Sequence, residues 1–138
     1  DLRHHAAAVA LGVVRGAIQA AGGKTRRERT ELAREAVGTA MEALGKTSAD
    51  PKDALRGAAY GAIVGASEAG LDPDQIAAEV VMAARKAAPN LGLSEREAIL
   101  TVAQAAVAST NQLDPLTATK VKEAILQELI LQTKDSEI

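Results

Sequence analysis

The dipeptide Asp-Pro occurs three times in this chain, at residues 50–51, 72–73 and 114–115. At the start of a helix, an aspartate accepts hydrogen bonds from backbone N–H groups that lack a helical partner, and a proline at the first position loses none. Ser94 and Glu97 have the spacing of a capping box, in which each side chain binds the other residue's backbone N–H. The sequence therefore predicts four helix starts between residues 50 and 115.

Two more helices are predicted earlier, over residues 4–21, ending at Gly22-Gly23, and over 26–44, ending at Gly45. The helix that opens at Pro51 should stop at Gly70, the next should end before Pro89, and the tail 133–138 should fray. Signals for strands are nearly absent. We expect one all-α domain over 1–138, with six helices in three antiparallel hairpins (about 4–45, 51–89 and 94–132) forming a bundle or a short helical repeat.

Apolar residues spaced three and four apart mark the helix faces expected in the core. These residues are Leu32, Ala33, Ala36, Val37, Ala40, Met41 and Leu44; Ile76, Val80, Val81, Ala84 and Ala87; Ile99, Val102, Ala103, Ala106 and Val107; and Val121, Ile125, Leu129 and Ile130. Because 31 residues are alanine and the sole aromatic is Tyr60, this core must be built from small side chains.

Glycines recur at every fourth position in two of the predicted helices, at Gly12 and Gly16 and at Gly57, Gly61 and Gly65. Residues spaced by four lie along one ridge, where the lack of side chains lets two helix backbones approach closely. One interpretation is a helix-pairing interface between subunits, with Tyr60 among its residues. The other is tight packing inside one bundle.

Two internal matches indicate a repeat. Residues 12–18 match 57–63, with glycines and the Ala-Ile pair in common, and Leu71-Asp72-Pro73 matches Leu113-Asp114-Pro115. The stretches 14–18 and 55–66 resemble uncharacterised bacterial helical domains that are rich in alanine and glycine. The resemblance implies a bacterial helical repeat of unknown function and no activity.

A basic cluster marks the start of the second predicted helix. It consists of Lys24, Arg26, Arg27 and Arg29. Cations at this end of a helix oppose the helix dipole, so the cluster has a small local cost. It could bind nucleic acid or another anion, dock on the more acidic later part of the chain, or be a solvated turn.

Several classes of site are excluded or disfavoured. The chain has no cysteine, which excludes thiolate metal sites, disulfides and a cysteine nucleophile. His4 and His5 are adjacent and point about 100° apart on a helix, which suits no shared metal. Gly22-Gly23-Lys24-Thr25 resembles the end of a phosphate-binding loop, but the glycine that should precede it is Ile18.

These observations favour a non-enzymatic helical interaction module, without cofactors, that forms a homodimer or binds a protein through its Gly/Ala-rich faces. Alternatives are an amphipathic binder of a lipid or granule surface, and a weak nucleic-acid binder through the basic cluster and the residues up to Arg34. No uncharged apolar run is long enough to span a bilayer, so we expect a soluble, cytoplasmic chain.

Overall fold

A computed structural model describes residues 25–47 and 50–136, together with isolated residues at 5, 8, 9, 12, 13 and 16. It contains five α-helices and one short 3-10 helix in the two continuous ranges. They are α2 (Arg26–Thr47), α3 (Pro51–Glu68), α4 (Pro73–Leu91), α5 (Glu95–Ser109), the 3-10 helix η1 (Thr110–Gln112) and α6 (Pro115–Ser136). The described residues contain no strand, so the all-α prediction is confirmed.

The helix predicted over 4–21 lies mostly outside the described residues, as does its end at Gly22-Gly23. The six positions described in that range are all helical. The prediction of six helices in three hairpins therefore has no complete counterpart in the described part of the chain.

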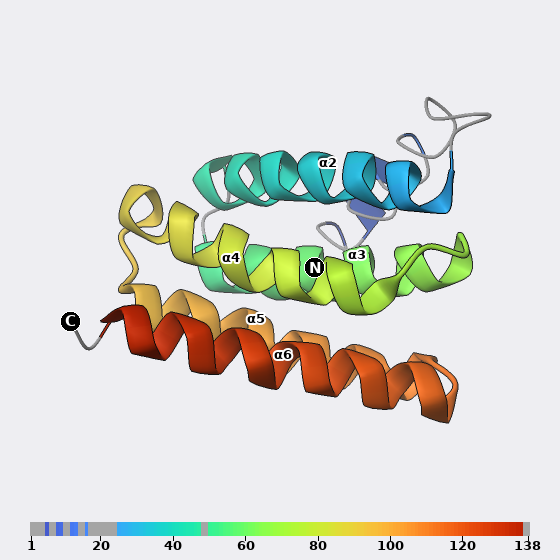
Figure 1. The fold of residues 1–138 in the computed structure, drawn as a ribbon. Helices are drawn as coiled ribbons and strands as arrows, with labels where there is room; N and C mark the ends of the chain where they lie inside the picture. Colours follow the sequence, from blue (N-terminus) through green and yellow to red (C-terminus); the bar gives the residue numbers. More distant parts are fainter. Residues whose placement is uncertain are drawn as a thin grey trace.

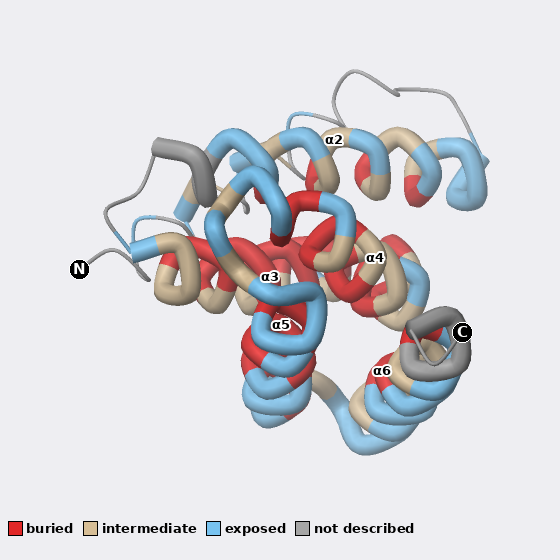
Figure 2. Tube along the Cα trace, turned by 90° about the vertical axis from the view of Figure 1, so that its left-hand side faces the viewer, coloured by how far each residue is buried: buried red, intermediate tan, exposed pale blue. Residues whose placement is uncertain are grey.

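The helices pack as a bundle (Figure 1). Consecutive helices run antiparallel. Helices α4 and α6 lie in front of α3 and α5 in Figure 1, and α2 lies across both α3 and α4 in Figure 2. The most extensive contacts join alternate helices: α2 with α4, α3 with α5, and α4 with α6. The main packing partners are therefore alternate helices, and not the two helices of a predicted hairpin.

All three Asp-Pro dipeptides open helices, as predicted. Asp50 accepts a hydrogen bond from the backbone N–H of Asp53 at 3.3 Å, and Asp114 accepts one from that of Thr117 at 2.9 Å. Asp72 differs, because its carboxylate makes no capping bond and lies 2.7 Å from Nη2 of Arg26. This aspartate therefore ties the start of α4 to the start of α2.

The capping box at the start of α5 is also confirmed. The Ser94 hydroxyl accepts from the backbone N–H of Glu97 at 3.0 Å, and the Glu97 carboxylate accepts from the backbone N–H of Ser94 at 3.3 Å. Lys52 of α3 adds an ion pair with Glu97 at 3.0 Å. The start of α5 is thus joined to the start of α3.

Three predicted helix ends are wrong. Helix α2 continues through Gly45 to Thr47, since glycine permits a left-handed turn but does not require one. Pro89 lies inside the last turn of α4, which extends to Leu91. Gly92 is the C-cap, with φ of 72°, and its backbone N–H donates to the carbonyl of Ala88. Helix α6 continues beyond residue 132 to Ser136.

The core lies between the five helices, with most of its buried residues on α3, α4 and α5 and further ones on the inner sides of α2 and α6 (Figure 2). Most of the predicted apolar stripes contribute to it, including Val37, Ile76 and Val102. Val107 and Ile130 were expected there and are instead 46% and 48% exposed. The reason is positional: they lie on sides of α5 and α6 that no other described helix covers.

Candidate functional site

The outer side of the α5–α6 pair carries large apolar side chains that face solvent. All exposed large hydrophobic residues of the described chain lie on these two helices: Leu100, Val107, Leu116, Leu126, Ile130 and Leu131. Figure 2 shows the exposed sides of α5 and α6 along the same edge of the molecule, turned away from α3 and α4. Exposed large apolar side chains on neighbouring helices make this side of the described chain a candidate interaction surface.

Four of these residues form what we call the outer apolar face: Leu100, Val107, Leu126 and Ile130. Leu126 and Ile130 are four residues apart and so lie on one side of α6. Leu100 and Val107 are two helical turns apart, which places them on one side of α5. Both sides are opposite to the buried stripes that contain Val102 and Val121.

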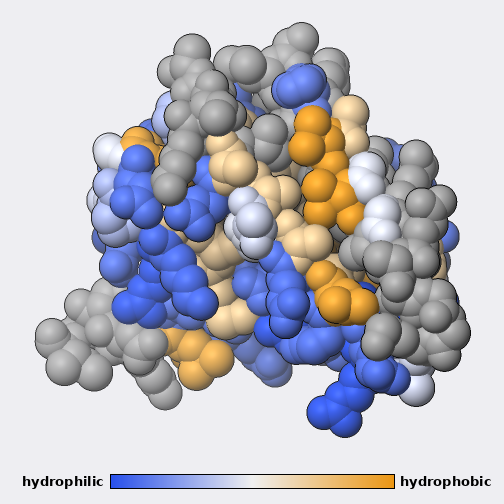
Figure 3. All heavy atoms as spheres, turned by 90° about the horizontal axis from the view of Figure 1, so that it is seen from above, coloured by the Kyte–Doolittle hydropathy of each residue, from blue (hydrophilic) through white to orange (hydrophobic). Residues whose placement is uncertain are grey.

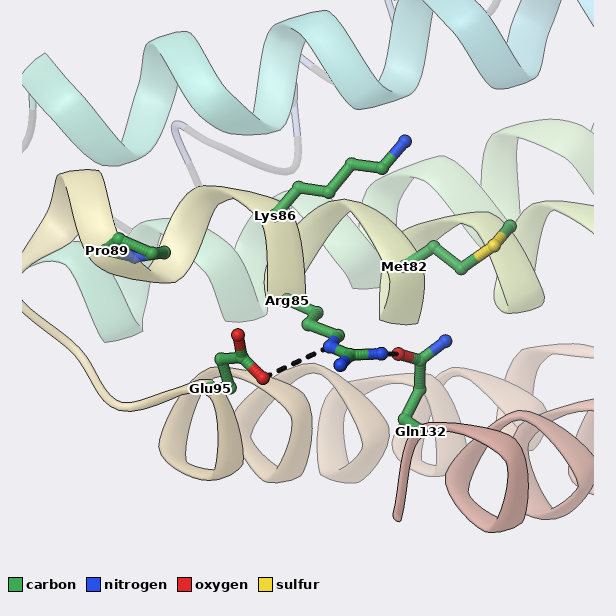
Figure 4. A pocket seen from close by; sticks show the side chains of 6 residues that line it. All are labelled: Met82, Arg85, Lys86, Pro89, Glu95 and Gln132. Carbon is green, nitrogen blue, oxygen red and sulfur yellow. Dashed lines mark hydrogen bonds and ion pairs between the residues drawn. The ribbon is translucent and has the colours of Figure 1, made fainter. Parts of the chain in front are cut away.

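Arg85 of α4 establishes how α5 and α6 are aligned. Its Nε donates to Glu95 at the start of α5 at 3.1 Å, and its Nη1 donates to Gln132 near the end of α6 (Figure 4). Residues 95 and 132 therefore lie at the same level of the antiparallel pair. Because the two helices are antiparallel, each residue forward from 95 along α5 corresponds to one residue back from 132 along α6. Leu100 therefore lies level with residue 127, close to the levels of Leu126 and Ile130.

The preceding helix pair shows what normally happens at these positions. Val107 lies as many residues after Ser94, the N-cap of α5, as Ile63 lies after Asp50, the N-cap of α3. Ile63 is fully buried. In the same way Leu126 and Ile130 of α6 correspond to Ala84 and Ala88 of α4, counted from the two Asp-Pro starts. Both alanines are fully buried. Three of the four residues of the outer apolar face thus correspond to positions that are buried in the preceding helix pair, whereas Leu100 corresponds to Arg56, which is half-buried.

A cavity of about 360 Å³ lies beside Arg85, between α4, α5 and α6. The residues that line it are Met82, Arg85, Lys86, Pro89, Glu95 and Gln132 (Figure 4). The guanidinium of Arg85 is already bound to two side chains that hold the helices together. The cavity is therefore better explained as the seam of this three-helix junction than as a binding site.

A second cavity, of about 380 Å³, lies between α2 and α4. At this cavity, Nε of Arg34 forms an ion pair with Oε1 of Glu79 at 3.4 Å. Nη1 of the same arginine also pairs with Oε1 of Glu31 at 3.3 Å. Burial raises the pKa of the Glu79 carboxyl, and the nearby charge of Arg34 opposes this. The described residues contain no group of three histidine or carboxylate side chains that could hold a metal ion.

The structure separates the glycines that the sequence singled out. Gly57, Gly61 and Gly65 are buried in α3, with Tyr60 half-buried among them. Gly12 and Gly16 are exposed, and among the described residues no atom lies within 4 Å of a Cβ built on either. The α3 glycines thus lie in the interior, as tight packing within one bundle requires.

The basic cluster is divided as well, and Lys24 lies outside the described residues. Arg26 pairs with Asp72 and donates to the carbonyl of Leu71, so it docks on the more acidic later part of the chain. Arg27 is exposed and Arg29 is half-buried. Hydrophilic residues cover much of the α2 side (Figure 3), where exposed Glu28 and Glu31 adjoin Arg27. These carboxylates weaken the attraction of the cluster for an anion.

The outer apolar face was missed as a site by the sequence analysis, although two of its residues, Val107 and Ile130, were noticed. Helical spacing identified them as part of apolar stripes and assigned them to the core. Counting from the N-caps would have placed them in register with Ile63 and Ala88. It would not have revealed that no following helix covers them.

No protein-family model matches the chain, and the searches of curated proteins and of solved structures also return no match. In the described part of the chain, no helix combines the length and apolar character needed to cross a bilayer.

Proposed function

We propose that this chain is a non-enzymatic helical interaction module that binds protein through the outer apolar face of α5 and α6. The observation that carries the proposal is the register of Val107, Leu126 and Ile130. They are exposed at positions whose counterparts in the preceding helix pair are completely buried. These side chains are already about half covered, so completing the burial of one contributes roughly half of the 1.5–3 kcal/mol of a fully buried apolar side chain.

The absence of a competing site in the described residues supports the same interpretation. Arg85 lines one of the two cavities and Arg34 the other, and both are bound to side chains of the chain itself. The buried glycines of α3 stabilise the close packing of the bundle. The outer apolar face is the feature of the described surface that the fold itself does not use.

Site-specific photo-crosslinking in cells tests this function. A photoreactive amino acid replaces Leu126, and the matched control carries it at Glu31, which is exposed on the hydrophilic side of α2. We expect a covalent adduct with a polypeptide from position 126 and none from position 31. The adduct should disappear when Ile130→Gln is added. Absence of any polypeptide adduct at position 126 would refute the function.

A further inference from the structure

We infer that the occupant of the outer apolar face is the same face of a second copy of this chain, related by a two-fold axis. The inference rests on the proposed function and names its partner. The surface to be covered spans two antiparallel helices, α5 and α6, whose exposed apolar residues Leu100, Leu126 and Ile130 lie at one level. A partner must therefore offer two neighbouring helices with an apolar face of similar width.

The chain's own α5–α6 pair satisfies this requirement. Within the bundle, the corresponding surface of α3 and α4 is covered by an antiparallel helix pair, namely α5 and α6 themselves. That contact uses the inner sides of α5 and α6, which contain Val102 and Val121, so it shows that an antiparallel helix pair is the kind of unit that covers such a surface. The outer side of a second α5–α6 pair offers an apolar unit of the same width. Two-fold pairing of one face with itself is also the commonest arrangement of homo-oligomers.

The whole outer side of α5 and α6, which contains the outer apolar face, approaches the size of a specific dimer interface. Helix α6 has 22 residues and α5 has 15. At a rise of 1.5 Å per residue and helix spacings of 8–10 Å, the two helices present a footprint of roughly 500 Å² per copy. The accessible area covered is larger than this flat footprint and approaches the roughly 600–1,000 Å² per partner of standard specific interfaces.

Charge does not oppose the pairing. Exposed residues of both signs lie on the same two helices as the face, with Arg96 on α5 and Lys120, Lys122 and Glu123 on α6. A second copy therefore meets a mixed surface and not a surface of one sign. The formal net charge of the whole chain is −2, so long-range repulsion between copies is weak.

The test is sedimentation equilibrium of the full chain over a wide range of concentration. The wild-type chain should form a dimer, and Leu126→Gln with Ile130→Gln should raise its dissociation constant at least about a hundredfold. The matched control is Leu131→Gln, which changes a residue on α6 that is 55% exposed but lies outside the face. It should leave the dissociation constant within about threefold. Circular dichroism of each variant verifies that the helices are retained.

Two results of the sedimentation experiment would overturn the inference. A wild-type chain that remains monomeric at every concentration would overturn the second copy as occupant. A dimer that persists in the double variant would overturn this face as the interface. In the crosslinking experiment, an adduct of twice the chain mass supports the second copy. An adduct of another mass, found with a monomeric purified chain, leaves the proposed function standing and rejects this partner. A purified chain that stays monomeric and sediments with anionic vesicles would reject this partner and favour the alternative of a lipid-surface binder.

Discussion

The half-buried carboxylate of Glu79 shows how a single residue can set the response of this bundle to pH. It lies between α2 and α4, where burial raises its pKa above the ordinary value of 4.5 and the charge of Arg34 limits the rise. Because the native carboxyl holds its proton more tightly than the unfolded one, the native state binds more protons between the two pKa values. Stability from this group is therefore lost as pH rises through that window.

We expect Glu79→Gln to remove this loss. Urea unfolding, followed by circular dichroism from pH 4 upward, gives the free energy of unfolding of each form. Relative to Glu79→Gln, the wild-type chain should become less stable as pH rises above 4.5. In an Arg34→Met background the fall should extend to higher pH, because the charge that lowers the pKa of Glu79 is gone. A stability difference that does not vary with pH would contradict this explanation.

The capping residues have the opposite pH dependence. Hydrogen bonds from Lys52 and Ser94 lower the pKa of Glu97, and those from Thr117 lower the pKa of Asp114. Carboxylates with depressed pKa values stabilise the fold above their unfolded pKa, and the contribution is lost as pH falls through the folded pKa. Lowering the pH should therefore weaken the capping of α5 and α6. It should at the same time reduce the free-energy cost of burying Glu79, because its carboxyl becomes protonated.

Ser94→Ala tests the capping box directly. It removes the hydroxyl that accepts from the N–H of Glu97, and loss of such a cap costs about 1 kcal/mol. The control Thr39→Ala removes an exposed hydroxyl from the middle of α2, where alanine is a better helix former. Thermal unfolding should shift downward for Ser94→Ala and not for Thr39→Ala. Equal melting temperatures for the two variants would contradict the role of the cap.

At the scale of single helices, starts were more predictable than ends. Asp50, Asp114 and Ser94 act on backbone groups within three residues, so the local sequence contains the whole cause. An end at glycine depends on whether the chain takes a left-handed turn there, as it does at Gly92 but not within α2 at Gly45. That choice depends on the packing of neighbouring helices, which a local pattern does not include.

Replacing Gly38 in α2 and Gly92 after α4 with alanine should change the free energy of unfolding in opposite directions. A Cβ at Gly38 would meet Glu79 Oε2 at 3.6 Å, an ordinary contact, so Gly38→Ala should gain up to about 1 kcal/mol of helix stability. Gly92 has φ of 72°, where a Cβ costs roughly 1–2 kcal/mol. Urea unfolding should show Gly38→Ala as more stable than wild type and Gly92→Ala as less stable. The same sign for both would refute the argument.

At the scale of the whole molecule, burial follows the order of the helices in the stack. Helix α4 contacts α2, α3, α5 and α6, whereas the contacts of α6 with other described helices are to α4, α5 and η1. Sequence periodicity identified the apolar stripes of α5 and α6 but not how many neighbours each helix would have. For this reason Val107 and Ile130 were assigned to the core, and the candidate site could not be predicted.

This order predicts a gradient of native-state hydrogen exchange. Amides buried on all sides open only when the whole bundle unfolds, whereas a helix covered on one side can open separately. We therefore expect the slowest exchange in the middle of α4, around Val80 and Val81, and faster exchange in α6.

If the outer apolar face pairs with a second copy, exchange in α5 and α6 should slow as protein concentration increases, while exchange in α4 changes less. In the Leu126→Gln, Ile130→Gln variant this concentration dependence should vanish and the gradient should remain, because the gradient belongs to the fold and the concentration dependence to the interface. Uniform exchange across the five helices would contradict the first expectation independently of the second.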